Sequence, residues 1–130
     1  MRLYILIAIG GALGSVLRFF LSGVFDHHLG GTFPWGILIV NVTGSFAIGF
    51  IYALTEPGGR WFASADTRLF LMTGICGGYT TFSSFSRDTL LLTRNGEWLH
   101  AGGNVVGSVT LCLIAVWLGH LLAATINQAR

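Results

Sequence analysis

The sequence contains no lysine, and charged residues of all kinds make up only 9% of its 130 residues, whereas soluble domains carry about 25%. Hydrophobic residues make up 53%. A chain of this length has too much surface for its volume to bury so much apolar side chain inside itself, so we expect it to face a lipid bilayer. A net charge of +2 provides no strongly basic surface, and we predict no nucleic-acid partner.

Cysteine is scarce, and the motifs of common enzymes are missing. Cys76 and Cys112 lie in separate apolar segments without CxxC spacing, which gives neither a disulfide framework nor a metal signature. We interpret them as reduced, buried thiols. There is no GxSxG or HExxH motif and no pair of catalytic carboxylates, and His120 in an apolar segment favours packing over catalysis. These absences predict that the protein is not an enzyme.

Long apolar runs dominate the sequence, and four of them have about the 20 residues that a membrane-crossing helix needs. They are Leu3–Val24, Trp35–Leu54, Leu69–Leu92 and Gly103–Ile126. The connectors between them collect charged residues, Gly, Pro and Asn, which are typical of turns; they are Asp26–Gly31, Glu56–Arg60 and Arg94–Glu97. The first run is too long for a signal-peptide core, and no A-x-A cleavage site follows it. We predict an all-α membrane protein with one four-helix transmembrane domain over residues 1–130.

All seven basic side chains are arginines, spread almost evenly over the two ends of the predicted bundle. Four helices place both termini on one side, together with Arg2, Arg60, Arg68 and Arg130, and leave Arg18, Arg87 and Arg94 nearer the other side. Orientation in a membrane follows the asymmetry of Lys and Arg, so two interpretations stay open. Either the even split is chance in a small number, or the chain inserts both ways up and two copies can pair antiparallel.

Glycine is abundant, with 19 residues, and several small residues stand four apart, a spacing that lets membrane helices approach closely. The pairs are Gly10 with Gly14, Ser45 with Gly49, Gly74 with Gly78, and Gly103 with Gly107. We expect close helix packing at these pairs. Four short helices cannot enclose a wide pore, so any transport path runs between subunits, which predicts a homo-oligomer.

Several polar side chains fall inside the apolar runs, where they are costly unless they face protein or water. They are Asn41 in the second run, Thr80, Ser84 and Asp88 in the third, and Asn104 and Ser108 in the fourth. Residues four apart share a helix face, so these stripes can line a narrow path. A single hydroxyl can equally bond to its own backbone, but the amide of Asn41 needs several partners and can donate to an anion.

Arg18 is a charged residue within the first apolar run. Three interpretations are open: the side chain snorkels to the membrane interface, it pairs with an acid such as Asp88, or it lies at the vestibule of a pore. Arg87 and Asp88 are neighbours near the end of the third run, where they can form a local ion pair or a set of charges at the helix end.

The segment GGYTTFSSFS, from Gly77 to Ser86, interrupts the third run. Two glycines weaken a helix by roughly 1 kcal/mol each relative to alanine, so we predict a helix break between Gly77 and Thr80. A break at membrane depth is tolerated where neighbouring protein packs it or where the freed carbonyls hold a cation. Phe82 and Phe85 then share a face. They either pack or turn the positive edges of their rings toward an anion.

Together with GGALGSVLRF in the first run, WGILIVNVTGSFAIG in the second and GSVT in the fourth, this segment resembles the Fluc fluoride channels, also called CrcB proteins. The resemblance covers the whole chain. It implies an antiparallel, dual-topology homodimer with two fluoride pores at the subunit interface, exporting fluoride passively across the cell membrane (the inner membrane of a Gram-negative cell).

The resemblance also implies roles for individual residues. Backbone carbonyls of Gly77 and Thr80 from both subunits would hold a structural sodium ion at the dimer centre. The residues expected along the fluoride pore are Asn41, Thr81, Phe82, Ser84, Phe85 and Ser108, and Arg18 matches a family arginine. Two residues depart from the family pattern: Asp88 stands where we expect glutamate, and Asn104 stands where some relatives carry tyrosine.

Two other functions are compatible with a small four-span protein. A dual-topology multidrug-type exporter depends on a glutamate in its first span, and Leu3–Val24 contains no acidic residue. A membrane assembly subunit that transports nothing would use Asn41, Phe82 and Phe85 for packing alone.

Overall fold

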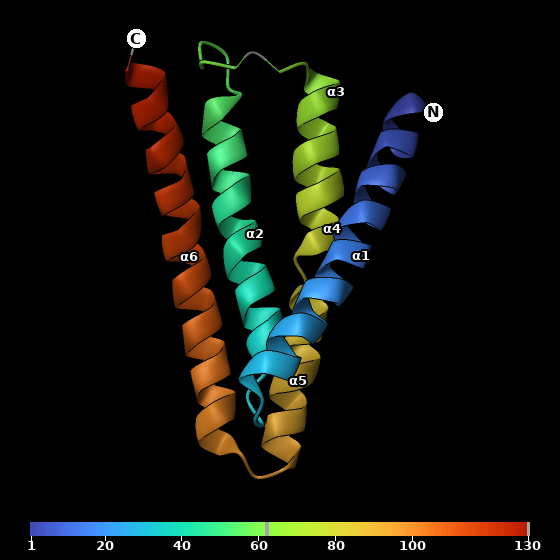
Figure 1. The fold of residues 1–130 in the computed structure, drawn as a ribbon, viewed down its shortest axis with the longest axis vertical. Coiled ribbons are helices and arrows are strands. Elements are labelled where there is room, and N and C mark those ends of the chain that lie inside the picture. Colours follow the sequence, from blue (N-terminus) through green and yellow to red (C-terminus); the bar gives the residue numbers. More distant parts are fainter. Residues whose placement is uncertain (62, 130) are drawn as a thin grey trace.

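The computed structural model describes residues 1–61 and 63–129, and every regular element in these ranges is a helix. The elements are α1 (Arg2–Leu29), α2 (Trp35–Leu54), α3 (Ala65–Arg68), the π-helix η1 (Leu69–Cys76), α4 (Gly77–Tyr79), α5 (Phe82–Arg94) and α6 (Trp98–Gln128) (Figure 1). Among the described residues, α1, α2 and α6 are long and apolar enough to cross a membrane. The all-α fold is confirmed, and the third predicted span is an interrupted helix.

Both termini lie at one end of the bundle, and the α1–α2 and α5–α6 connectors lie at the other (Figure 1). Arg2 begins α1, Arg60 lies in the α2–α3 connector and Arg68 ends α3, which places these three at the end of the termini. Arg18, Arg87 and Arg94 belong to the opposite half, and Arg130 lies outside the described residues. The described arginines are therefore divided equally between the two ends.

The first and last long helices extend beyond the apolar runs that predicted them. α1 continues to Leu29, so the prediction that Asp26 and its two following histidines form a connector is wrong. Hydropathy marks where a helix leaves the lipid, whereas the helix ends only where Gly30 adopts a φ of 62°, which glycine does without steric cost. Asp26 accepts a hydrogen bond from the N–H of Gly36 at 2.7 Å and so joins the end of α1 to the start of α2.

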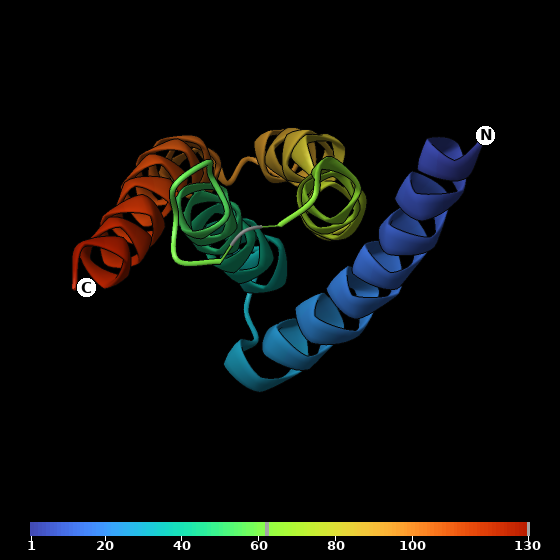
Figure 2. The same ribbon diagram turned by 90° about the horizontal axis from the view of Figure 1, so that it is seen from above.

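Glycine brings α1 close to the third, interrupted helix, as the sequence predicted for two of the small-residue pairs. A Cβ on Gly10 would lie 2.9 Å from the Cα of Gly74, and a Cβ on Gly14 would lie 2.7 Å from the backbone nitrogen of Tyr79. Gly78 packs against the backbone of Gly11 in the same way. Seen along the bundle, α1 runs across this contact and diverges from the other helices toward the N-terminus (Figure 2).

A second glycine contact joins α2 to α6. Gly49 packs against the backbone of Val116, and Gly119 packs against the backbone of Phe46. The contact expected at Gly103 and Gly107 is not made among the described residues: beyond the glycine's own helix turn, none of their atoms lies within 4 Å of a Cβ built on Gly107, and only the ring of Phe33 approaches one on Gly103, at 3.9 Å. This part of α6 presents a glycine face to the outside of the chain.

The last carbonyls of α2 have partners from other elements. Arg68 donates to the carbonyl of Thr55 at 2.5 Å and places its guanidinium 5.4 Å from the centre of the Tyr52 ring. Asn127 donates to the carbonyl of Ala53 at 2.8 Å. Because the final carbonyls of a helix have no partner within it, these contacts hold α2 to its neighbours at the end that carries the termini.

Candidate functional site

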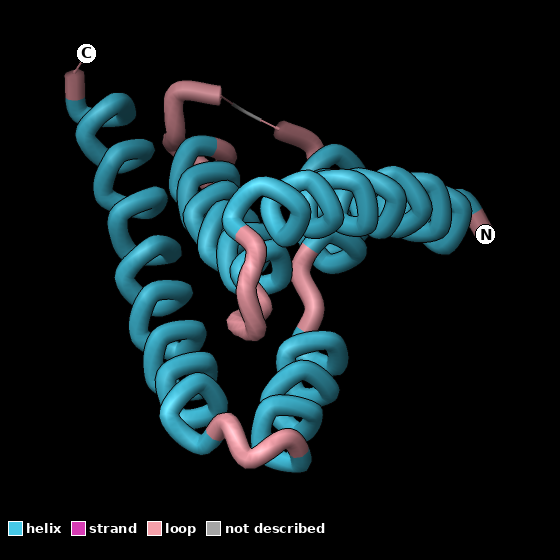
Figure 3. Tube along the Cα trace, turned by 60° about the horizontal axis from the view of Figure 1, so that its bottom comes forward, coloured by secondary structure: helices cyan, strands magenta, loops and turns pink. Residues whose placement is uncertain are grey.

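The third helix is interrupted at Thr80 and Thr81, where Figure 3 shows a loop between two helical segments. Both residues are extended, with φ and ψ of −81° and 157° at Thr80 and of −154° and 118° at Thr81. The break was predicted between Gly77 and Thr80 and lies at the end of that range, because both glycines are helical and the chain leaves the helix at Thr80. Gly78 is needed for the close approach to α1. The π-helix η1, which precedes the glycines, was not predicted.

The side chain of Asn41 replaces the helical partners that Thr81 has lost. Its Oδ1 accepts a hydrogen bond from the Thr81 N–H at 2.8 Å, and its Nδ2 donates to the Thr81 carbonyl at 3.1 Å. An amide carries two N–H donors, so one of them serves the backbone. The sequence predicted that this amide needs several partners. The structure shows that two of its hydrogen bonds hold the interrupted third helix to α2 at Thr81.

Other side chains stabilise the two helix ends that the break creates. The carbonyl of Gly78 accepts from Arg18 Nε at 3.2 Å and from Ser15 at 3.3 Å. Thr81 caps α5, because its hydroxyl accepts from the N–H of Ser84 at 3.1 Å. Thr80 donates its hydroxyl to the carbonyl of Cys76 at 3.0 Å. These three backbone groups, the Gly78 and Cys76 carbonyls and the Ser84 N–H, thus have partners from α1 and from within the broken helix.

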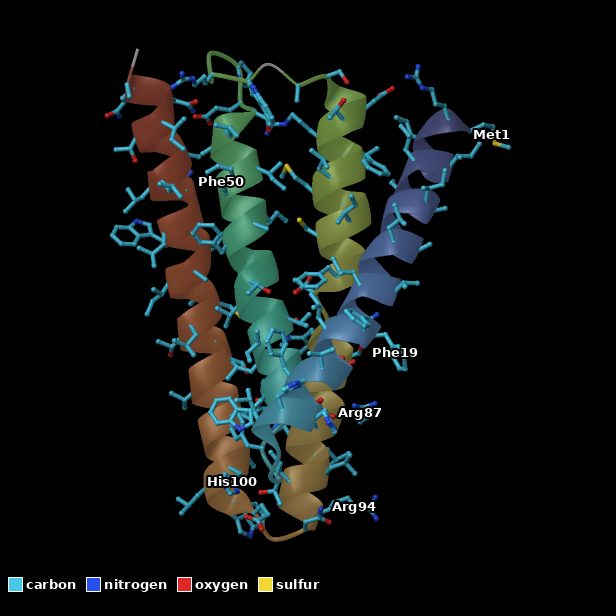
Figure 4. The ribbon with its side chains drawn as sticks, in the orientation of Figure 1. Met1, Phe19, Phe50, Arg87, Arg94 and His100 are labelled. Atoms are coloured by element: carbon cyan, nitrogen blue, oxygen red, sulfur yellow. The ribbon has the colours of Figure 1, made fainter. Side chains whose placement is uncertain are left out.

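Arg18 therefore has a specific partner, but this partner is not an acid. Its Nε bonds to the carbonyl of Gly78, whereas Asp88 pairs with Arg87 at 2.7 Å. The local ion pair between Arg87 and Asp88 is present, as one interpretation of the sequence held. Figure 4 shows Arg87 and Arg94 extending from α5 on the side away from α6.

A cavity of about 390 Å³ opens beside the break. Seven of the nine residues predicted for the site line it: Asn41, Gly77, Thr80, Thr81, Phe82, Phe85 and Ser108. They come from α2, from the break and its two flanks, and from α6. No charged side chain is among the lining residues that the structure describes. The cavity therefore presents an amide, hydroxyls, backbone and rings, with no fixed charge.

The two phenylalanines of the cavity differ in how they are held. Phe85 is buried, with 7% of its surface exposed, whereas Phe82 is 77% exposed. Their ring centres are 5.2 Å apart and their planes are inclined by 48°. Phe85 is thus fixed by packing within the chain, and Phe82 stands at the open side of the cavity, where lipid or another protein chain would cover it.

Ser108 belongs to a buried line of hydrogen bonds that extends from α6 to α5. Its hydroxyl donates to Asn104 Oδ1 at 3.3 Å, and Asn104 Nδ2 donates to the hydroxyl of Thr89 at 2.9 Å. The hydroxyl of Thr89 donates in turn to the carbonyl of Phe85 at 2.8 Å. The shared face of Asn104 and Ser108 was predicted from their spacing. The part played by Thr89 was missed, since nothing in one sequence shows which hydroxyl of α5 faces α6.

Ser84 and Arg18 line a second cavity, of about 990 Å³, at the end of the bundle that carries the α1–α2 connector. Unlike the first cavity it is lined by charged and titratable groups: Arg18, Asp26, His27, His28, Arg87 and Asp88. The structure thus separates the predicted site residues into two groups. Most gather around the uncharged cavity, and Ser84 and Arg18 border the charged one.

The residues of the break suit a cation that binds to oxygen. Within the described residues, no group of three or more His, Cys, Asp or Glu side chains could hold a metal ion. In an uninterrupted helix the carbonyl of Gly77 would accept from the N–H of Thr81, but that N–H bonds to Asn41 instead. Gly77 and Thr80 both face the uncharged cavity. Backbone oxygens freed in this way are typical ligands of hard cations.

Comparison with known proteins assigns the family. Residues 5–120 match the family model described as CrcB-like protein, Camphor Resistance (CrcB). The chain is 61% identical over 130 residues to a fluoride-specific ion channel FluC of Opitutus terrae, with 100% of this chain and 98% of that protein covered. It is 56% identical to the FluC of Paramagnetospirillum magneticum, with 98% of this chain and 100% of that protein covered, and 53% identical to that of Methylocella silvestris, with 98% and 97% covered. The chain belongs to the CrcB family of multi-pass membrane channels, and it is not an enzyme.

Proposed function

We propose that this protein is a fluoride channel through which the anion leaves the cytoplasm passively. The observation that carries the proposal is the uncharged cavity, in which the rings of Phe82 and Phe85 meet the amide of Asn41 and the hydroxyl of Ser108. Relatives that are 53% to 61% identical over nearly the whole chain are named fluoride-specific ion channels. HF that enters a cell ionises at cytoplasmic pH, and the trapped anion then needs a path across the membrane.

The chemistry of the cavity suits an anion that binds weakly and moves on. Ring edges carry partial positive charge, and an amide N–H or a hydroxyl can replace one water of the anion's hydration shell. A fixed cation would hold the anion more tightly, and conduction requires that each site release its ion. Arg18 and Arg87 instead border the second cavity, where they can attract anions before the anions reach the uncharged site.

The pore is completed by a second copy of the chain in antiparallel orientation. Three observations support this part of the proposal: the near-even division of the arginines between the two ends, the exposure of 77% of Phe82, and a cavity that opens at the surface of one chain. Gly77 and Thr80 of both copies would together hold a sodium ion, whose charge would compensate the freed carbonyls. The protein would reside in the cell membrane, which is the inner membrane in a Gram-negative cell.

The test is fluoride efflux from proteoliposomes, followed with a fluoride electrode and compared with chloride efflux from the same preparation. We expect rapid fluoride efflux and little chloride efflux. Monodisperse, reconstituted protein that releases no fluoride would contradict the proposal. Equal rates for the two anions would leave a channel without the proposed selectivity.

A further inference from the structure

Asn104 is a buried amide that the proposed fluoride path does not explain. Only 2% of its surface is exposed, and it does not line the uncharged cavity. Its Nδ2 donates to Thr89 at 2.9 Å, and within the described residues this is the one side-chain hydrogen bond between α5 and α6. Its Oδ1 accepts from Ser108, which does line the cavity.

The direction of these hydrogen bonds follows from the last of them. The Thr89 hydroxyl has one proton, which it gives to the Phe85 carbonyl at 2.8 Å, so it can only accept from Asn104. The amide must then turn Nδ2 toward Thr89 and Oδ1 toward Ser108. The hydroxyl proton of Ser108 is therefore directed at Asn104, and its oxygen lone pairs remain for the cavity. An anion in the cavity therefore faces the oxygen lone pairs of the Ser108 hydroxyl and not its proton.

We propose that Asn104 is a positioning residue that competes with the anion for the hydroxyl proton of Ser108 and so keeps anion binding weak. This inference rests on the proposed function. When Ser108 rotates to donate to an anion, the buried Oδ1 of Asn104 loses its donor, and an unsatisfied buried acceptor is unfavourable. The same acceptor recovers the proton when the anion leaves. Asn104 thereby favours release over retention, although it does not touch the anion.

The experiment measures initial fluoride efflux over a range of fluoride concentrations, using the full-length protein in proteoliposomes. Wild type, Asn104→Leu, Ser108→Ala and the double variant form a cycle that isolates the coupling between the two residues. Leucine keeps the approximate volume and removes the acceptor. We expect Asn104→Leu to lower the half-saturating fluoride concentration about tenfold, as loss of one competing hydrogen bond implies, and to lower the maximal rate because release is slower.

In the Ser108→Ala background, Asn104→Leu should leave the half-saturating fluoride concentration unchanged. The hydroxyl proton for which Asn104 and the anion compete is then absent. A shift of equal size in both backgrounds, or no shift in either, would overturn the inference while wild-type efflux upholds the proposed function. Should Asn104→Leu fail to yield folded protein, Thr89→Val removes the acceptor that orients the amide. It should give a smaller shift of the same sign that again requires Ser108, and a shift independent of Ser108 would contradict the inference.

Discussion

At the scale of single residues, Asn41 shows how one side chain can support a backbone and face a cavity at once. Its Oδ1 and one N–H bond to Thr81, and the residue also lines the uncharged cavity. The sequence was enough to identify Asn41, Phe82, Phe85 and Ser108, because polar groups and paired rings are unusual in an apolar run. It could not show the bonds of Asn41, since these depend on a contact between residues 40 positions apart.

Asn41→Asp should lower fluoride efflux roughly a hundredfold, because a carboxylate would repel the anion and like charges brought together cost several kcal/mol. It would also face the Thr81 carbonyl without a donor. Efflux from proteoliposomes measures the effect.

Asn127→Asp is the matched control for this substitution. Asn127 likewise makes two hydrogen bonds to backbone groups, at the end of the bundle that carries the termini. It donates to the Ala53 carbonyl at 2.8 Å and accepts from the Arg60 N–H at 2.7 Å. It should lose stability but keep efflux. Native efflux in Asn41→Asp would remove this residue from the anion path.

Phe82→Ile should suppress fluoride efflux by tenfold or more while the protein stays folded. Isoleucine keeps the apolar bulk but lacks the positive ring edge, whose attraction for the anion contributes roughly 1 kcal/mol or more. Phe46 is also partly exposed, at 36%, and stacks on Phe50 away from the cavity. Phe46→Ile is therefore the control, with native efflux expected. Equal efflux from the two variants would show that the Phe82 ring has no role in conduction.

At the scale of helices, glycine and threonine have different roles in the interrupted third helix. The glycines let α1 approach, and the break comes only at Thr80 and Thr81. Hydropathy predicted that four apolar segments exist and gave the bounds of α2 correctly. It began the break at Gly77, three residues before the helix ends at Thr80, and missed η1, because intrinsic glycine propensity is weaker than tertiary contacts. Which hydrogen bonds a helix gives up depends on its neighbours.

Gly14→Ala should lower the free energy of unfolding by about 1–3 kcal/mol, the usual effect of overpacking, because the new Cβ would lie 2.7 Å from the Tyr79 nitrogen. Gly23→Ala on the same helix meets nothing within 4 Å and should be neutral or stabilising. The apparent melting temperature of the detergent-solubilised protein, read from the monodisperse fraction after heating, compares them. Equal melting temperatures would contradict the packing of α1 on the broken helix.

At the scale of the whole molecule, the chain leaves the surface proposed to line the pore open. Phe82, the uncharged cavity and the glycine face of α6 are all accessible on one chain. The family resemblance led to the expectation of a dimer, and composition alone led only to an oligomer. Neither could be derived from helix geometry, because the contacts that pair two chains depend on surface shape rather than on hydrophobic pattern.

A single cysteine introduced at Asn95, in the connector between α5 and α6, should be modified about equally from the two sides of a membrane if the chain inserts both ways up. Cys76 and Cys112 are first replaced by alanine so that only the new thiol reacts. A membrane-impermeant thiol reagent applied outside, then inside after permeabilisation, gives the ratio. Modification from one side only would rule out dual topology.

Removing sodium should weaken the dimer if Gly77 and Thr80 hold that ion. Protein purified throughout with N-methylglucamine in place of sodium should show a smaller dimer fraction by size-exclusion chromatography and lower efflux. Adding sodium back, but not the same concentration of N-methylglucamine chloride, should restore both. A dimer that stays intact through prolonged sodium-free incubation would contradict a required sodium ion.

The near-even division of the seven arginines between the two ends, four against three by sequence, has a genetic consequence. If the chain inserts both ways up, one gene supplies both halves of an antiparallel pair. A single Lys or Arg added to a connector can set the orientation of the chain in the membrane. A gene with such a mutation would produce chains of one orientation only, and it would need a second gene for chains of the opposite orientation. Two alleles biased in opposite directions would then be needed together for fluoride resistance, and this is a route from one gene to two specialised copies.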